Sequence, residues 1–292
     1  MVEENAPGAV ELLKEAFPHT GKATVIGVTG SPGAGKSSLV DRMVGSFRRA
    51  GHRVGVIAVD PSSAYSGGAI LGDRIRMQEH ALDDGVFIRS MATRGCLGGL
   101  SRASADAIDL MDTAGYDPVI VETVGVGQDE IEVVRAADAV CVVLVPGMGD
   151  DIQAIKAGIL EIADLFVINK ADKPGADRLI TDLEYMLSLA SGPQNFRPEI
   201  LKTVAVRNEG VEELCRGIQE FIRSADDSRK DRRRKERAEA RFRTILSERL
   251  SARVMEKVFQ GQDLERLLDR IADRSTDPYT AVGQVLARVE VR

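Results

Sequence analysis

The stretch that most constrains the fold is Val25–Ser38, where an apolar run passes into a glycine-rich turn and then into a helical pattern. Gly30–Ser37 matches the spacing G-x-x-x-x-G-K-[ST] of a phosphate-binding loop. Glycines there let backbone N–H groups converge on a phosphate, and the next helix directs its positive N-terminal end to the same point. The residues expected to form this site are Gly30, Ser31, Pro32, Gly33, Ala34, Gly35, Lys36, Ser37 and Ser38. Lys36 is expected to reach the β- and γ-phosphates, and Ser37 to ligate Mg²⁺.

Strands and helices alternate through the first 224 residues, which predicts an α/β fold. The strand candidates are Thr24–Val28, Val54–Val59, Val86–Ser90, Val119–Glu122, Ala139–Val145, Leu165–Asn169 and Ile200–Val204. The helical patterns between them are Ser37–Ala50, Ser101–Met111, Asp129–Ala136, Ile152–Ile162, Ala176–Leu189 and Val211–Ser224. This order implies a mostly parallel central sheet with helices on both faces. Because ligands of such sheets bind beyond the carboxyl ends of the strands, the loops after the strands are the candidate site.

Composition narrows the class of partner and the compartment. The formal net charge is −6, which does not favour a nucleic-acid or membrane-surface binder. The three cysteines (Cys96, Cys141 and Cys215) have no paired spacing, as expected of reduced thiols. The acidic N-terminus has no apolar signal segment, and no apolar run approaches the length of a membrane span. We therefore expect a cytoplasmic protein that binds neither nucleic acid nor membrane.

Acidic and glycine residues after the second and fourth strand candidates predict a metal site and a switch. Asp60 ends the second strand and is a candidate Mg²⁺ ligand, the alternative being an Asp-Pro turn. Asp73 is either a second metal neighbour or the acid that begins a helix. Glu122 is expected to hold Mg²⁺ through water, and the Gly125 N–H to contact the γ-phosphate. Gln128 is the candidate for orienting the attacking water.

The loop Pro146–Lys156 after the fifth strand is glycine-containing and charged. It is either a mobile segment beside the nucleotide or an ordinary acidic start of a helix, which the helix dipole favours. In the first case Asp150, Asp151 and Lys156 form pairs that change with the nucleotide state, and Lys156 is a candidate catalytic residue.

The sixth strand ends in Asn169-Lys170-Ala171-Asp172, which predicts recognition of guanine. The Asp172 carboxylate can accept hydrogen bonds from both N1–H and the N2 amino group of guanine, and adenine offers neither donor. Lys170 is expected to lie along the base or ribose, and Asn169 to brace the neighbouring loops. Ala205, with Val206 beside it, is expected to direct a backbone N–H to the guanine O6.

The expected domains are a short N-terminal helical segment (1–21), a nucleotide-binding domain (22–224) and a C-terminal helical arm (225–292). Residues 226–243 are dense in charge. Such a run is more often a solvated helix face than a polybasic binding site. From Phe242 apolar residues recur at helical spacing, and Asp277-Pro278 is expected to stop this pattern within the arm. Long apolar stripes are seldom left bare, so the arm is expected to form a homodimer.

Four motifs together resemble the MeaB/ArgK family of P-loop GTPases, the G-protein chaperones of adenosylcobalamin-dependent acyl-CoA mutases. They are Thr29–Ser37, Asp60–Ser63, Glu122–Gln128 and Asn169–Asp172. The resemblance covers residues 16–220 closely and continues more loosely through Asp277–Thr280. It implies a G domain of the SIMIBI type in a cytoplasmic or mitochondrial homodimer. Such a protein binds GTP or GDP with Mg²⁺ and hydrolyses GTP slowly. The resemblance also implies a switch loop over Gly147–Lys156. It also implies a client such as methylmalonyl-CoA mutase or a relative, whose cofactor loading the chaperone gates and which it protects or reactivates.

Three other functions compete with this interpretation. A nickel-metallochaperone GTPase has the same broad fold but expects a metal-binding Cys/His cluster, and His19, His52 and His80 are scattered. An ATP-dependent small-molecule kinase conflicts with the Asn169–Asp172 motif. A dimeric scaffold with a vestigial nucleotide site conflicts with the intact Lys36, Ser37 and Asp172.

Overall fold

The computed structural model describes residues 8–60, 77–80, 82–92, 102–123, 136–147, 162–189, 197–259 and 263–289. The chain divides into two compact units, one ending at Arg237 and the other beginning at Ala238. Within the described residues no helix has the length and apolarity needed to cross a bilayer.

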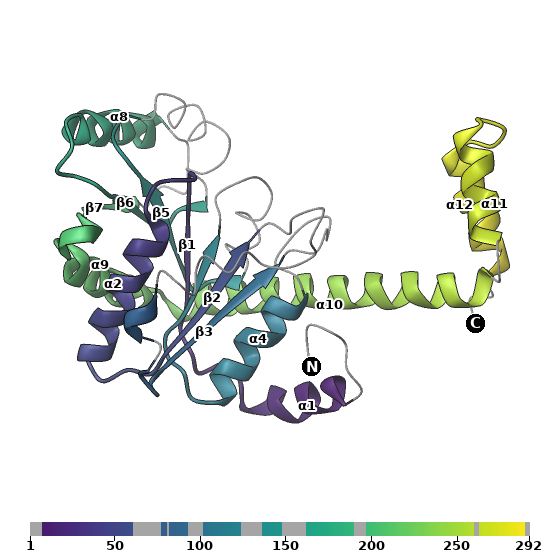
Figure 1. Cartoon of the computed structure of the whole chain (residues 1–292), viewed down its shortest axis with the longest axis horizontal. Coiled ribbons are helices and arrows are strands. Elements are labelled where there is room, and N and C mark those ends of the chain that lie inside the picture. Colours follow the sequence, from purple (N-terminus) through teal and green to yellow (C-terminus); the bar gives the residue numbers. More distant parts are fainter. Residues whose placement is uncertain are drawn as a thin grey trace. The chain divides into compact units, whose positions relative to one another are not determined.

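The first unit is built on one parallel sheet (Figure 1). In the described part of the chain the sheet has seven strands in the order β3-β2-β4-β1-β5-β6-β7, and every strand pair is parallel. The strands are β1 (Val25–Gly30), β2 (Val54–Asp60), β3 (Val86–Ala92), β4 (Val119–Thr123), β5 (Ala139–Leu144), β6 (Leu165–Ile168) and β7 (Glu199–Lys202). The α/β fold class and all seven predicted strands are thereby confirmed.

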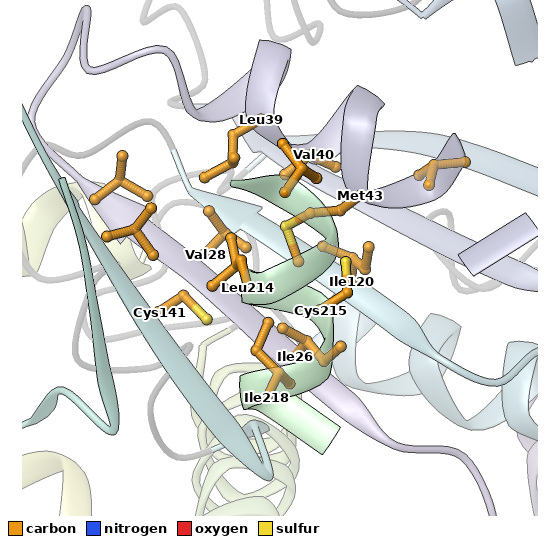
Figure 2. Packing of buried hydrophobic residues seen from close by; sticks show 14 of the residues in the cluster. Ile26, Val28, Leu39, Val40, Met43, Ile120, Cys141, Leu214, Cys215 and Ile218 are labelled. Atoms are coloured by element: carbon orange, nitrogen blue, oxygen red, sulfur yellow. The ribbon is translucent and has the colours of Figure 1, made fainter. Parts of the chain in front are cut away.

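Helices cover both faces of the sheet, because successive strand residues point to opposite sides. The helices of the first unit are α1 (Ala9–Ala16), α2 (Lys36–Arg49), α4 (Arg102–Thr113), α8 (Ala176–Leu189) and α9 (Val211–Ser224), with short 3₁₀ helices η1 (Phe17–His19), η2 (Gln78–His80) and η4 (Ala205–Arg207). On one face α2 and α9 pack on β1, β4 and β5 (Figure 2). On the other face lie α4 and α8, with side chains such as Met111 and Leu183 fully or almost fully buried.

The predicted helix 129–136 has only its last residue, and the predicted helix 152–162 only Ile162, within the described residues.

The C-terminal segment consists of α10 (Asp227–Val258), α11 (Asp263–Ala272) and α12 (Pro278–Arg288). The apolar pattern was expected to stop at Asp277-Pro278, and α11 does end before this pair, but the sequence did not predict that a further helix begins there. Asp277 is the N-cap of α12, where its carboxylate accepts from the Thr280 N–H at 2.9 Å, and Pro278 is the first helical residue. Proline suits that position because the first N–H of a helix has no partner within the helix. The Thr280 hydrogen bonds hold the pKa of Asp277 below its ordinary value.

The charged start of α10 was predicted to be a solvated face. This prediction was wrong for Arg229, Arg233 and Arg237, which form one row on the helix and pair with acidic residues that precede two strands of the sheet. Arg229 and Arg233 both pair with Asp164, which is 3% exposed and lies just before β6. Arg233 also donates to the Asp138 carbonyl, and Arg237 pairs with the Asp138 carboxylate just before β5. All five residues belong to the first unit, so the first turns of α10 are part of its fold.

Candidate nucleotide site

The phosphate loop follows β1 directly and precedes α2. Its first residue, Gly30, has φ of 135°, and a Cβ there would lie 2.1 Å from the Val143 carbonyl oxygen of β5. Gly35 has φ of 84°, and a Cβ there would lie 2.6 Å from the amide nitrogen of Asn169. Only glycine fits both the conformation and the space at these two positions. The loop therefore passes close to β5 and to the loop after β6.

Lys36 is the first residue of α2 and is 5% exposed. Its Nζ donates to the carbonyl oxygens of Gly30 at 2.6 Å and Ser31 at 3.0 Å, so the ammonium group lies within the loop. Ala34 is fully buried and its N–H donates to Ser31, whereas Pro32 and Gly33 are exposed. The charge of Lys36 and the N-terminal end of α2 thus favour the same place for an anion.

The two predicted metal ligands of the described region lie together. Ser37 Oγ donates to Glu122 Oε1 at 2.7 Å, and Glu122 is 6% exposed. The contact follows from the sheet, because Glu122 pairs in register with Val28 of β1. One residue further along the same two strands, the buried hydroxyl of Thr123 donates to that of Thr29 at 3.0 Å.

A hydroxyl and a carboxylate at this distance suit Mg²⁺, which prefers hard oxygen ligands, few carboxylates and several waters. Asp60 is the last residue of β2, at the same end of the sheet, and its side chain lies outside the described residues. The described residues hold no cluster of three His, Cys, Asp or Glu side chains able to bind a metal ion.

Asn169 joins the phosphate loop to the loops that follow β6 and β7, and it is 2% exposed. Its amide nitrogen donates to the Ala34 carbonyl at 2.8 Å. Its Oδ1 accepts from Thr203 Oγ1 and from the Ala205 N–H, both at 3.2 Å. This is the bracing contact that the sequence predicts. The Ala205 N–H is engaged by Asn169, so its contact with a guanine oxygen stays a prediction.

Lys170 and Asp172 lie on the loop that follows β6. Lys170 has φ of 55°, and its Nζ donates to the Gly33 carbonyl at 2.7 Å, which makes a second link to the phosphate loop. The Asp172 carboxylate is exposed, and Arg207 Nη1 lies 3.6 Å from its Oδ2. Val206, also on η4, is 77% exposed. Sequence reasoning missed Arg207, because no motif spacing marks it as a neighbour of Asp172.

A hydrogen bond joins two elements that lie next to the loop carrying Asp172. Lys202 Nζ at the end of β7 donates to Asp177 Oδ1 in the first turn of α8 at 2.7 Å. This bond holds the pKa of Asp177 below its ordinary value. The bond thus links the end of β7 to the helix that follows the loop 169–175, which carries Asp172.

The remaining predicted site residues lie outside the described part of the chain. They are Asp73, Gly125, Gln128, Asp150, Asp151 and Lys156. Ser38 lies in the first turn of α2 and is exposed. The structure therefore brings together the predicted phosphate-loop residues, Glu122, Asn169, Lys170, Asp172, Ala205 and Val206 at the carboxyl ends of β1, β4, β6 and β7.

Known proteins resemble the chain over most of its length. The profile of a family described as "Methylmalonyl Co-A mutase-associated GTPase MeaB" matches residues 1–258. A candidate GTPase of Pyrococcus abyssi is 53% identical over 75% of this chain and 69% of its own length. The GTPase ArgK of Escherichia coli is 41% identical over 73% of this chain and 66% of its own length. A crystal structure of an LAO/AO transport system kinase superposes with a TM-score of 0.69 at 28% identity, covering 95% of this chain and 85% of that one.

Proposed function

Because the chain belongs to the family of methylmalonyl-CoA mutase-associated GTPases, we propose that it binds and hydrolyses GTP as a chaperone of an adenosylcobalamin-dependent acyl-CoA mutase. The observation that carries the nucleotide part is the contact of Asn169 with both Ala34 and Ala205. One side chain thereby links the loop that fits phosphates to the loop that fits a purine base.

The base is selected at Asp172. Its carboxylate is exposed and can accept from the two donors on the edge of guanine. Adenine would leave this acceptor without a donor and would place its own ring nitrogen against a negative charge. A charged acceptor that finds no hydrogen-bond donor in the complex reduces the binding free energy more than a neutral one does. ATP is therefore expected to bind far more weakly than GTP.

The phosphates are held by the loop Gly30–Gly35 and by Lys36. Backbone N–H groups and the ammonium group stabilise the negative charge that moves toward the β–γ bridging oxygen as the bond to the γ-phosphorus breaks. Ser37 and Glu122 are the described residues that would hold Mg²⁺, which supplies further positive charge to the β- and γ-phosphate oxygens when bound. Water replaces GDP at the γ-phosphorus, and inorganic phosphate leaves.

Gln128 and Lys156 remain the candidates for orienting that water. Slow turnover follows if these residues are fixed in place only when a client protein docks, since phosphoryl transfer depends on positioning. The family description supports a methylmalonyl-CoA mutase or a relative as that client. The chaperone would gate loading of the cobalamin cofactor and protect or reactivate the mutase, in the cytoplasm.

The C-terminal arm is proposed to form a homodimer. Four side chains on α10 support this, since Phe242, Leu246, Leu250 and Met255 are all at least 42% exposed within the second unit. Apolar side chains at helical spacing seldom remain uncovered in a stable protein. A second copy of the chain would bury them.

The decisive test is GTP turnover by the purified protein with and without a methylmalonyl-CoA mutase. We expect slow release of phosphate alone and faster release with the mutase, and the Asp172→Asn variant should prefer xanthosine triphosphate to GTP. A protein that hydrolyses GTP but is stimulated by no acyl-CoA mutase would contradict the chaperone function. A protein that fails to bind GTP would contradict the whole proposal.

Two alternatives are separated by binding measurements. Calorimetry that finds ATP bound more tightly than GTP would favour a small-molecule kinase. Stoichiometric nickel binding in equilibrium dialysis would favour a nickel chaperone, a function for which the described residues offer no cluster of three potential metal-binding side chains.

A further inference from the structure

Arg207 lies beside the one carboxylate that is proposed to read the base. Its Nη1 is 3.6 Å from Asp172 Oδ2, which is close enough for attraction between the charges but beyond a hydrogen bond. The lone pairs of Asp172 therefore remain available to other donors, because a carboxylate can accept about four hydrogen bonds. Arg207 can act on Asp172 without blocking it.

The backbone that carries Arg207 is a closed turn. Val204 and Glu209 form an antiparallel bridge, with the Val204 N–H donating to the Glu209 carbonyl at 3.0 Å and the Glu209 N–H to the Val204 carbonyl at 3.3 Å. Asn169 Oδ1 holds the first residue of η4, Ala205. The turn ends at Gly210, where a Cβ would lie 2.1 Å from the Lys202 carbonyl oxygen. The start of the Arg207 side chain is thus fixed relative to the loop after β6.

The guanidinium group is fixed at its other end by Glu209. Arg207 Nε lies 2.9 Å from Glu209 Oε1 in an ion pair, and Nη2 donates to Glu209 Oε2 at 3.3 Å. This two-point contact leaves Nη1 as the nitrogen nearest to Asp172. An arginine held in this way presents a charge in one direction, which a freely rotating side chain does not.

From this geometry we propose that Arg207 is a positioning residue that strengthens the preference of Asp172 for guanine by orienting its carboxylate. The torsion of an aspartate carboxylate is broad, so an exposed aspartate loses orientational freedom when it must accept two parallel donors. A fixed positive charge beside Oδ2 restricts that rotation before the base arrives. The inference rests on the proposed function, since it assumes that guanine is the base at this site.

The test compares GDP with inosine diphosphate, which keeps N1–H but lacks the 2-amino group. The variants are Arg207→Gln, which removes the charge but keeps a polar side chain, and Arg207→Lys, which restores the charge. Dissociation constants for both nucleotides are measured by calorimetry on the full chain, with thermal unfolding to show that each variant is folded. We expect Arg207→Gln to bind GDP about threefold to fivefold more weakly, the change typical of losing an exposed ion pair.

The ratio of the two dissociation constants carries the conclusion. Inosine diphosphate makes one contact with Asp172 and should be weakened less than twofold, so discrimination between the nucleotides falls in Arg207→Gln and recovers in part in Arg207→Lys. A control is Arg178→Ala, which removes an exposed arginine paired with Asp182 on its own helix, and should leave the ratio unchanged.

Equal weakening of GDP and inosine diphosphate by Arg207→Gln would show that Arg207 only supports the turn, and would overturn the inference. An unchanged ratio in every variant would overturn it as well. Either result leaves the proposed GTPase intact, because the unaltered protein still binds GDP. A failure of the unaltered protein to bind GDP contradicts the proposed function instead.

Discussion

Gly30 is the residue at which the sheet and the phosphate loop most closely constrain each other. A Cβ at this position would lie 2.1 Å from a backbone oxygen of β5, and φ is 135°. We expect Gly30→Ala to lower the free energy of unfolding by about 3 kcal/mol and to abolish GDP binding, because strained backbone and overpacking add together. Urea unfolding and calorimetry measure the two effects.

The matched control for this substitution is Gly51→Ala. Gly51 also has a positive φ, 89°, but a Cβ there would meet nothing within 4 Å. The free energy of unfolding of the Gly51→Ala variant should therefore fall by only about 1 kcal/mol, from backbone strain, and its affinity for GDP should be unchanged. Equal losses in the two variants would show that the contact with β5 has no part in the effect.

At the same scale, the sequence predicts those site residues whose roles depend on spacing along the chain. Lys36, Ser37 and Asn169 follow their strands at fixed offsets, so a motif is enough to place them. Arg207 was not predictable, because its approach to Asp172 depends on the bridge between Val204 and Glu209 and on its ion pair with Glu209. Such contacts arise only when a turn has closed.

At the scale of elements, the first turns of α10 are attached to the sheet by arginines. Arg233 makes two hydrogen bonds to the buried Asp164, at 2.7 and 2.9 Å. We expect Arg233→Ala to lower the free energy of unfolding by about 2 kcal/mol, because the buried carboxylate loses one of its two arginine partners. Arg232→Ala removes the neighbouring arginine, whose partner Glu236 is on the same helix, and should change stability by about 0.5 kcal/mol or less. The prediction fails if the two variants unfold alike in urea.

A second element contact makes stability depend on pH. Arg48 of α2 binds Asp83 through two hydrogen bonds of 2.8 Å, and this contact holds the pKa of Asp83 below its ordinary value. A carboxylate with a lowered pKa stabilises the fold above its unfolded-state pKa, and this contribution disappears as pH falls through the folded-state pKa. The stability difference between the unaltered protein and Asp83→Asn should be constant above about pH 5 and shrink below about pH 4.

The control for this pH dependence is the Arg48→Gln background. There the effect of the Asp83→Asn substitution should depend less on pH, because Arg48, the main cause of the lowered pKa, is gone and the Gly85 N–H still donates to Asp83. A difference that grows on acidification in the unaltered background would contradict the assigned sign.

The strands of the sheet were predictable because parallel strands buried on both faces are short apolar runs, and all seven were identified. The helix α12 was missed because Asp-Pro either ends one helix or begins the next, and the pair alone does not distinguish the two. The arginine row on α10 was misjudged because its partners Asp138 and Asp164 lie about 65 to 100 residues earlier in the chain. Charge density along the chain carries no information about such distant pairs.

At the scale of the whole molecule, the chain divides at Arg237 rather than at the start of α10. We expect a chain truncated after Arg237 to remain folded and to bind GDP within about a factor of two of the full chain, because sites without shared partners contribute independently. A chain truncated after Ser224 loses Arg229, Arg233 and Arg237, and should unfold at a lower temperature. Thermal unfolding and calorimetry compare the two.

The same pair of truncated chains bears on the proposed homodimer. Both lack the apolar side chains from Phe242 onward, so both should sediment as monomers at concentrations at which the full chain is expected to dimerise. Dimers formed by the chain that ends at Arg237 would place the interface in the first unit instead.

The hydrogen bonds of Asn169 to two loops have a thermodynamic consequence. Because Asn169 bonds to both residues, ordering the loop at Ala34 also orders the loop at Ala205, so the entropy of ordering the two loops is lost once rather than twice. Guanosine and pyrophosphate, offered together as separate fragments, would then each bind more tightly than when offered alone. The intact nucleotide would dissociate in a single step, in which the base and the phosphates are released together.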